Sequence, residues 1–359
     1  MLIQVKIENC LRQYQDPYLL KDLVTAKSIK NIFIENDQVI IDIELGYPLA
    51  GFKEEMITAL KTHLQQRLDL EKIQINISWK IISHAVSQTL KPLAAVKNII
   101  AVASGKGGVG KSTTAVNLAL ALKAEGANVG ILDADIYGPN QPQMLGVRQS
   151  PEMKTKAGLT PVVGHGIQSM SMGYLVDVNT PMIWRGPMVS QALQQLLNET
   201  HWDNLDYLII DLPPGTGDIQ LTMAQKIPVT GAVIVTTPQD IALLDARKGL
   251  EMFRKLKIPV LGIIENMSTH ICSHCGFEED IFGSGGAARL ANATESELLG
   301  KLPLDKKIRE QADSGQPTVA SDPNGAIAMI YRNIARRIAA KLALQGKDYG
   351  LKFPKIVVE

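Results

Sequence analysis

The stretch from Gly105 to Thr113 constrains the fold of this chain more than any other. It reads G-K-G-G-V-G-K-S-T and fits the phosphate-binding pattern G-x-x-x-x-G-K-[ST] in full. The apolar run 98–104 before it suits a buried parallel strand. The Ala- and Leu-rich run 114–125 after it stops at Gly126, as a helix does. Strand, loop and helix therefore stand in the order that a P-loop requires.

Each residue type in this stretch matches a demand of phosphate binding. Glycines let backbone N–H groups turn toward phosphate oxygens without a Cβ in the way, and the helix N-terminus adds positive potential. The pattern predicts that Lys111 reaches the β- and γ-phosphates and that the Ser112 hydroxyl binds Mg²⁺. The predicted ATP-binding residues in the loop are Gly105, Lys106, Gly107, Gly108, Val109, Gly110, Lys111, Ser112 and Thr113.

Composition narrows the class of protein. The 359 residues carry a net charge of +1, 45% of them are hydrophobic, and no Lys/Arg run suggests a nucleic-acid-binding surface. Residues 1–6 lack the basic start of a signal peptide, and every apolar run is too short to span a membrane. Three cysteines do not make a disulfide framework. We expect a cytoplasmic protein with reduced thiols and with neither nucleic acid nor membrane as a partner.

Residues 1–80 are predicted to form a small α+β domain. The segment 38–45 partly alternates between apolar and polar residues, and 72–79 alternates strictly, as half-buried strands do. Between them, 52–68 has apolar residues at helical spacing. Cys10 lies in an early helical stretch, where we expect a small, buried, apolar residue.

The remaining chain divides into a linker at 81–97, a P-loop ATPase domain at 98–345 and a C-terminal tail at 346–359. Polar residues and proline break any pattern in the linker, whereas the ATPase domain alternates strands with helices. Repeated βα units fold into a mainly parallel, doubly wound sheet that binds ligands at the carboxyl ends of its strands. Strands are expected at 98–104, 128–135, 205–211, 231–237 and 260–266, and helices at 188–198, 240–256, 305–312 and 325–344.

Three aspartates stand at the ends of predicted strands. Asp133 and Asp135 either cap the next helix or serve a metal shell or a water molecule beside the phosphates. Asp211 ends the apolar run 208–210, as a Walker B acid does, and is predicted to hold the Mg²⁺ shell through water. The loop that follows, 212–218, reads L-P-P-G-T-G-D, and its glycines suit a switch that moves and offers an N–H to the γ-phosphate.

Cys272 and Cys275 form a C-x-x-C motif in a predicted loop, a spacing at which two thiolates chelate one soft metal centre. Three interpretations fit: a structural zinc shared with His270 and His274, a redox dithiol, and half of an iron–sulfur site. Redox dithiols accompany a thioredoxin-like βαβ unit, which is absent from this sequence pattern. A four-iron cluster needs four cysteines, and two copies of the chain related by a two-fold axis would supply them.

With a second lysine at Lys106, the loop resembles the deviant Walker A motif of the MinD/ParA and nitrogenase-iron-protein group. That resemblance implies a homodimer in which Lys106 crosses the interface to the partner's nucleotide, much as an arginine finger does. It also implies that Asp135 orients the attacking water. The predicted catalytic residues are therefore Lys106, Lys111 and Asp135.

The chain also resembles the Mrp/ApbC family of iron–sulfur cluster carriers, strongly over 98–304 and more weakly before that. The resemblance rests on N-M-S at 266–268, C-S-H-C-G at 272–276 and I-F-G-S-G-G at 281–286, and W-R-G-P-M at 184–188 is also typical of that family.

This resemblance implies an ATP hydrolase that holds a [4Fe-4S] cluster between two subunits through Cys272 and Cys275 and passes it to apo iron–sulfur proteins. It places the adenine pocket at Asn266 and Pro303. The first domain resembles iron–sulfur assembly factors, but it has G-Y-P-L at 46–49 where those factors often carry a cysteine, so we expect no metal site there.

A ParA/MinD-like positioning switch with a structural zinc at the C-x-x-C motif is the main alternative. Such switches attach through a C-terminal amphipathic helix or a basic face, and the segment 347–359, with Pro354 and mixed charge, supports neither. A reductase that passes electrons through the cluster is a further alternative.

Overall fold

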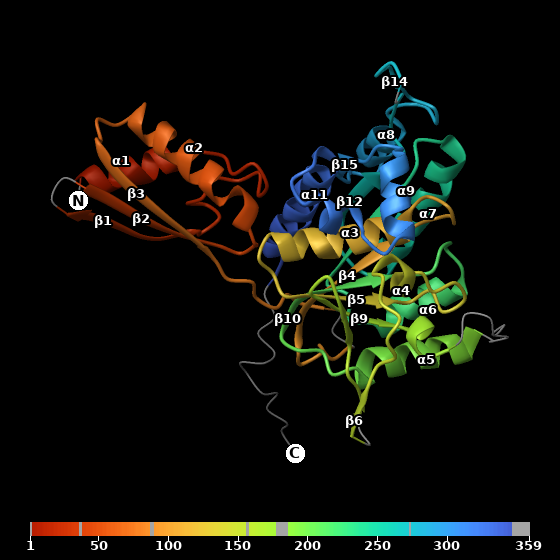
Figure 1. Ribbon diagram of the computed structural model, residues 1–359. Coiled ribbons are helices and arrows are strands. Elements are labelled where there is room, and N and C mark those ends of the chain that lie inside the picture. The colour runs from red at the N-terminus through yellow and green to blue at the C-terminus, as the bar shows by residue number, and fades with distance from the viewer. Residues whose placement is uncertain are drawn as a thin grey trace.

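The computed structural model describes residues 2–35, 38–86, 90–155, 158–176, 186–272 and 274–346. A small N-terminal α+β unit lies beside a larger α/β unit (Figure 1). Trp184 and Arg185, which the sequence marked as typical of the resembled family, and the tail from 347 onward lie outside the described residues.

An eight-stranded sheet forms the centre of the large unit. All neighbouring strands are parallel except β8, which runs antiparallel to β9 at one edge. The strand before the P-loop, β4, lies between β11 and β10 in the middle of the sheet. In spatial order the strands are β15 (Leu298–Lys301), β12 (Val260–Glu265), β11 (Gly231–Thr236), β4 (Val96–Ala103), β10 (Leu205–Asp211), β5 (Val129–Asp133), β9 (Ile167–Ser171) and β8 (Val162–Gly164).

Helices cover both faces of this sheet because its central strands are apolar on both sides. Ile100 and Val102 of β4 belong to the core on one face, and Ile99 and Ala101 to the core on the other. The first face carries α3 (Lys111–Ala124), α10 (Thr318–Ser321) and α11 (Ala326–Ala343), and the second carries α5 (Gly186–Glu199), α6 (Asp218–Lys226), α7 (Asp240–Lys255) and α8 (Gly286–Ala293). Shorter elements are α4 (Gln141–Met144), α9 (Lys306–Asp313), β6 (Met153–Thr155), β7 (Gly158–Leu159) and the 3-10 turns Ala50–Phe52 and Met172–Tyr174.

The N-terminal unit is a three-stranded sheet in the order β1-β2-β3 with two helices. Along β2 buried and half-buried residues alternate, as they do in a strand with one covered face. Cys10 is 4% exposed, which confirms the prediction of a small buried residue. The elements are α1 (Leu2–Leu11), β1 (Ile29–Glu35), β2 (Gln38–Leu45), α2 (Lys53–Gln65) and β3 (Lys72–Trp79).

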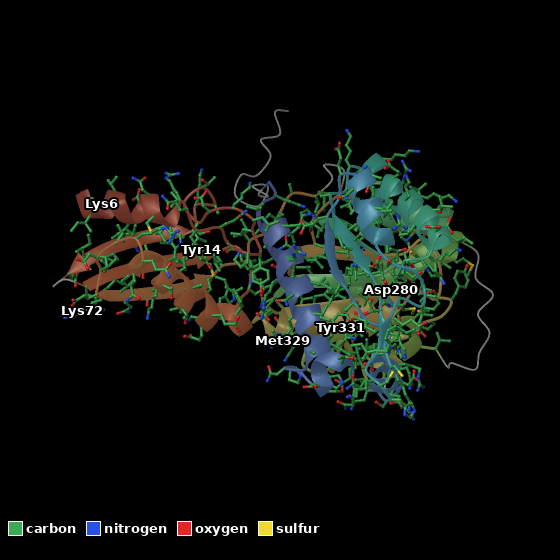
Figure 2. The ribbon with its side chains drawn as sticks, turned by 90° about the horizontal axis from the view of Figure 1, so that it is seen from above. Lys6, Tyr14, Lys72, Asp280, Met329 and Tyr331 are labelled. Carbon is green, nitrogen blue, oxygen red and sulfur yellow. The ribbon has the colours of Figure 1, made fainter. Side chains whose placement is uncertain are left out.

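A buried ionic cluster joins the two units at the end of α3. Glu125 is fully buried and accepts hydrogen bonds at 2.7 Å from both Arg332 and Arg336 of α11. Its other carboxylate oxygen accepts the backbone N–H of Gly51, in the N-terminal unit, at 2.9 Å. Arg336 also donates to the hydroxyl of Tyr18 at 2.9 Å. Helix α11 thus lies where the two units meet (Figure 2).

The predicted fold class, a mainly parallel α/β sheet preceded by a small α+β unit, is confirmed. Boundaries differ in places. Strand β4 begins at Val96, inside the predicted linker, because Val96 pairs with Leu205 of β10. Strand β5 ends at Asp133, so Asp135 lies in the loop beyond it. Among the helices of the described chain, none is long and apolar enough to cross a membrane.

Candidate functional site

The P-loop connects β4 to α3 and is held from two sides. Gly110 has a φ of +79°, in the left-handed region that favours glycine. A Cβ on Gly105 would collide with the backbone of Asp245 in α7, so this glycine permits close packing. On the other side, the amide of Asn266, which follows β12, donates to the carbonyl of Val109 at 2.8 Å. The structure therefore brings Asn266 into direct contact with the P-loop.

Lys111 is paired with Asp211 at the buried centre of the site. The Lys111 Nζ donates to Asp211 Oδ1 and lies 3.1 Å from Ser112 Oγ. Lys111 is 5% exposed and Asp211 is fully buried. The Nε2 of Gln141, the first residue of α4, donates to Asp211 Oδ2 at 2.8 Å and to the Ser112 carbonyl at 3.1 Å. The predicted phosphate-binding lysine and the predicted magnesium residues therefore form one cluster.

Asp133 anchors the loop that follows β5. Its Oδ2 accepts the backbone N–H groups of Asn140 and Gln141, each at 3.0 Å, and the hydroxyl of Ser171 at 3.1 Å. Burial, and next the negative charge of Asp211, raise the pKa of Asp133 to about 7. Of the two roles that the sequence left open, these contacts favour capping of the next helix, because Asn140 and Gln141 stand at the start of α4.

Asp135 is half-buried and faces the same cluster. Its Oδ1 accepts the backbone N–H of Gly138 at 3.3 Å. Burial raises its pKa above the ordinary value, against the opposing effect of the Lys111 charge. A carboxylate with a raised pKa accepts a proton or a hydrogen bond from water more readily near neutral pH.

The predicted switch loop contacts the residue before the P-loop, and Lys106, within the loop, lies near α7. The backbone N–H of Gly215 donates to the Ser104 carbonyl at 3.0 Å, so in this structure it is directed to β4 and not toward a phosphate. The Nζ of Lys106 lies 3.9 Å from a carboxylate oxygen of Asp245, which pairs more closely with Lys248 at 3.0 Å. Lys106 is 40% exposed, so its amino group is held only loosely by its own chain.

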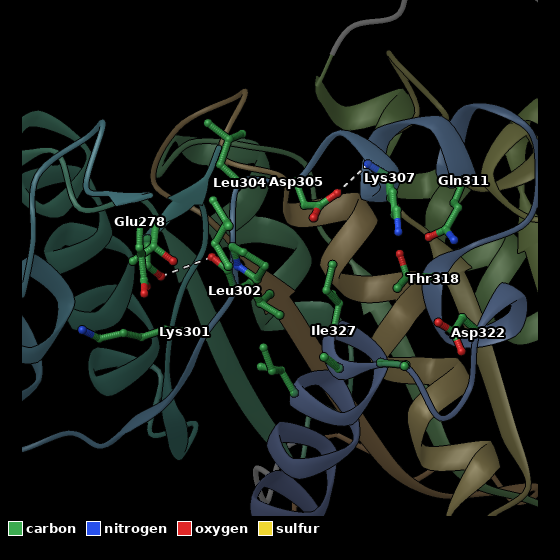
Figure 3. Close-up of a pocket in the computed structure, with 18 residues that line it drawn as sticks. Glu278, Lys301, Leu302, Leu304, Asp305, Lys307, Gln311, Thr318, Asp322 and Ile327 are labelled. Carbon is green, nitrogen blue, oxygen red and sulfur yellow. Dashed lines mark hydrogen bonds between the residues drawn. The ribbon is translucent and has the colours of Figure 1, made fainter. Parts of the chain in front are cut away.

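A pocket of about 630 Å³ opens beside the segment that follows Asn266 (Figure 3). Two backbone hydrogen bonds, from Ser268 N to Leu302 O at 3.0 Å and from Leu304 N to Thr269 O at 2.8 Å, align that segment with the turn containing Pro303. Pro303 lines the pocket, together with the apolar side chains of Leu302, Leu304 and Ile327 and the polar side chains of Lys307, Gln311 and Thr318.

The C-x-x-C motif lies at the tip of a short hairpin, formed by β13 (His270–Ile271) and β14 (Glu278–Glu279). The backbone N–H of Cys272 donates to the carbonyl of Phe277, and that of Gly276 donates back to the Cys272 carbonyl, each at 2.9 Å. Gly276 has a φ of +69°, which lets the chain turn between the two strands. Cys275 is exposed and Cys272 is partly exposed. In place of the expected loop, the two cysteines therefore stand between two short paired strands, and neither thiol is buried.

Local geometry favours the thiolate form of Cys272. Backbone N–H groups, first that of Cys275 and then that of His274, hold the pKa of Cys272 below its ordinary value. The Nδ1 of His270 is hydrogen-bonded to the Leu304 carbonyl at 3.0 Å. Within the described residues, no three His, Cys, Asp or Glu side chains are grouped as metal ligands. Among the residues that the structure describes, one chain thus brings Cys272 and Cys275 to the hairpin without a third His, Cys, Asp or Glu side chain grouped with them as a metal ligand.

Gln141 and Asp245 are the two site residues that the sequence did not reveal. Gln141 stands in the run Y-G-P-N-Q-P, which has no recognisable phosphate or metal pattern, and Asp245 stands in the middle of an ordinary helix. Only the folded sheet brings them to the P-loop.

Comparison with known proteins identifies the family of this chain. A family model described as NUBPL iron-transfer P-loop NTPase matches residues 95–339, and one described as iron-sulfur cluster assembly protein matches residues 4–77. The chain is 50% identical over 356 residues to the iron-sulfur cluster carrier protein of Escherichia coli K12, covering 96% of this chain and 94% of that protein. It is 51% identical over 254 residues to the iron-sulfur cluster transfer protein NUBPL of Mus musculus, covering 70% of this chain and 80% of that protein.

Solved structures agree as well. The nucleotide-binding protein of Archaeoglobus fulgidus in complex with ADP is 37% identical and superposes with a TM-score of 0.57, covering 64% of this chain and 90% of that one. The cell division ATPase MinD of Pyrococcus furiosus is 24% identical with a TM-score of 0.52, over 67% and 98% of the two chains, and shares the fold. The resemblance drawn from the sequence is confirmed, and this chain belongs to the family of NUBPL-type iron-transfer P-loop NTPases.

Proposed function

We propose that this chain is a homodimeric ATPase that holds a [4Fe-4S] cluster between its subunits and transfers it to apo iron–sulfur proteins. The observation that carries the proposal is the pair of surface cysteines, Cys275 exposed and Cys272 partly exposed, with no third ligand grouped beside them in the described part of the chain. A four-iron cluster needs four cysteines, and a second copy across a two-fold axis supplies the other two. The names of the E. coli and mouse relatives support cluster carriage.

The position of the hairpin at the surface suits a cluster that must be transferred to another protein. Thiolates are the ligands of iron, and the lowered pKa of Cys272 favours that form. Because neither thiol is buried and both lie between the two short strands of the hairpin, an acceptor's cysteines can reach the cluster without unfolding the carrier.

The proposal of ATP binding rests on the side chains grouped at the P-loop, Gly105 to Thr113. Its cation, Lys111, is paired with Asp211, and phosphate oxygens of a bound nucleotide would take the place of that carboxylate. Ser112 and Asp211 provide the oxygen donors that Mg²⁺ prefers, and a buried, unpartnered amide oxygen lies beside them on Gln141, so the residues present fit this ion. When bound, Mg²⁺ neutralises charge on the phosphate oxygens.

Asp135 and Lys106 complete the proposed hydrolysis site. Asp135 accepts a hydrogen bond from the attacking water and holds it in line, a role that its raised pKa suits. Lys106, exposed and loosely tied to Asp245, extends to the nucleotide of the partner subunit and stabilises charge there. The adenine ring is assigned to the pocket lined by Pro303, next to Asn266.

Anaerobic reconstitution with iron and sulfide tests the cluster proposal. We expect four irons and four sulfides per dimer, and none in the variant Cys272→Ser with Cys275→Ser, which keeps its affinity for ATP. Cys10→Ala is the matched control, because that thiol is buried in the N-terminal unit and should not affect iron content. A full cluster in the double variant would contradict the proposal, and a cysteine-dependent zinc without any cluster would support the positioning switch with a structural zinc.

A further inference from the structure

Gln141 holds the two predicted magnesium residues together from a third element. Its side chain and backbone connect the start of α3, the end of β10 and the end of β5: Nε2 donates to Ser112 O and Asp211 Oδ2, and the backbone N–H donates to Asp133 Oδ2. It is fully buried, so these contacts are made without competition from water.

The same amide has one atom without a partner. Gln141 Oε1 is buried and accepts no hydrogen bond from the protein. Buried polar atoms are nearly always paired, so an orphaned acceptor next to a predicted metal site indicates a donor that arrives with a ligand. Water bound to Mg²⁺ is such a donor, since this ion keeps several waters when it binds beside phosphates.

The side-chain amide of Gln141 also contacts the carboxylate of the Lys111–Asp211 ion pair. While Lys111 contacts Asp211 Oδ1, Gln141 holds Oδ2 of the same carboxylate. Among the described residues Lys111 is the cation paired with Asp211, so when Lys111 turns to the phosphates the carboxylate would otherwise be free to rotate. The hydrogen bond from Gln141 keeps that carboxylate facing the metal shell.

We propose that Gln141 is a positioning residue for the magnesium ion: its Nε2 orients Asp211, and its Oε1 accepts a hydrogen bond from a water of the metal shell. This inference rests on the proposed function, because it requires nucleotide and Mg²⁺ at the P-loop. Groups that orient metal ligands change metal affinity or activity about 10–100-fold when removed.

The test measures ADP affinity in Mg²⁺ and in EDTA by calorimetry, without any turnover. In Gln141→Met, which keeps the length of the side chain and removes both polar atoms, we expect the tightening of ADP binding by Mg²⁺ to shrink about 10-fold or more relative to the wild type. Affinity in EDTA should stay within about twofold, because the side-chain amide of Gln141 contacts the Ser112 carbonyl and the Asp211 carboxylate, and neither of these groups binds phosphate directly.

Gln143→Met is the matched control. Gln143 lies on the same short helix but is exposed, and its amide donates to the Asp313 carbonyl at 2.7 Å, away from the P-loop. It should keep the full effect of Mg²⁺. If Gln141→Met does not fold, Gln141→Asn replaces it, since the shorter amide fits the space but cannot hold both partners, and the same loss is expected.

An unchanged ratio of ADP affinities in the folded Gln141 variant would overturn the inference, and so would a wild-type protein that binds ADP equally well with and without Mg²⁺. Failure of the wild type to bind ADP at all would instead overturn the proposed function.

Discussion

Lys111 and Asp211 form an ion pair whose side chains are 6% and 0% exposed, in the position where the phosphates of a nucleotide are expected. Removing one member of a buried pair leaves an uncompensated charge, which costs about 3–5 kcal/mol. The folded protein is therefore stabilised in part by the same lysine that we propose for phosphate binding. Substitutions at Lys111 and Asp211 can therefore separate the effect on stability from the effect on activity.

Lys111→Ala should lower ATP turnover at least about 100-fold, because no other cation of the loop reaches the phosphates in its place. It should also lower the unfolding midpoint of the nucleotide-free protein. Adding Asp211→Asn removes the orphaned charge, so the double variant should regain most of the stability and none of the turnover. Phosphate release and denaturant unfolding measure the two effects, and full turnover in Lys111→Ala would contradict the assignment.

The pKa of Asp133 makes the stability of the nucleotide-free protein depend on pH. Its folded value of about 7 lies above the ordinary 3.8, so the folded protein binds this proton more tightly than the unfolded chain does. The resulting stabilisation is complete below about pH 4 and is lost as the pH rises through 7.

Asp133→Asn should remove that dependence. The thermal midpoint of the wild type should fall more than that of the variant between pH 5 and pH 8, and the two curves should converge at low pH. Asp240→Asn serves as the control because its carboxylate is 90% exposed. Parallel curves for the wild type and Asp133→Asn would show that the titration of this carboxyl is not coupled to folding.

Mixing two inactive variants tests whether Lys106 acts across the dimer. A Lys106→Ala subunit keeps its own Lys111 but cannot serve its partner, and a Lys111→Ala subunit has the converse defect. Half of randomly assorted dimers are mixed, and each has one complete site, so about a quarter of the wild-type turnover should return.

In the control mixture, the Lys111→Ala subunit is replaced by a subunit that carries both Lys106→Ala and Lys111→Ala. This double variant cannot supply the missing Lys106. That mixture should remain inactive. Equal activity in the two mixtures, or full activity of Lys106→Ala alone, would show that the lysine serves no partner.

Glu125 should be among the most destabilising positions outside the nucleotide site. Its carboxylate is fully buried between Arg332 and Arg336, so Glu125→Ala leaves two guanidinium groups without their partner and should cost about 3–5 kcal/mol. Glu310→Ala removes an exposed i,i+4 partner of Lys306 and should cost less than about 0.5 kcal/mol. Denaturant midpoints compare the two, and similar losses would mean that the junction between the units contributes little.

Local pattern was enough to predict most of the large sheet and the P-loop. The apolar run before Gly105 and the helix α3, which begins at Lys111, are where the motif placed them, and Asp211 ends its strand as expected. Strand β9 was missed because I-Q-S-M-S has little apolar periodicity, and it forms because it pairs with β5. Such a strand is specified by its neighbour and not by its own residues.

The site was predicted less completely than the fold. Residues within one motif, such as Lys111 and Ser112, can be assigned from spacing, whereas Gln141 and Asp245 reach the site only through the packing of α4 and α7. The hairpin around Cys272 was expected to be a loop, because two-residue strands are too short to leave a periodic signal.

The central claim is that one chain supplies half of the cluster site and half of the catalytic site, and that two copies complete both. Native mass spectrometry of the anaerobically reconstituted protein with ATP tests it most directly. We predict a dimer carrying a single four-iron, four-sulfide cluster, which is lost together with Cys272 and Cys275. A strictly monomeric protein with nucleotide, iron and sulfide all supplied would contradict the account.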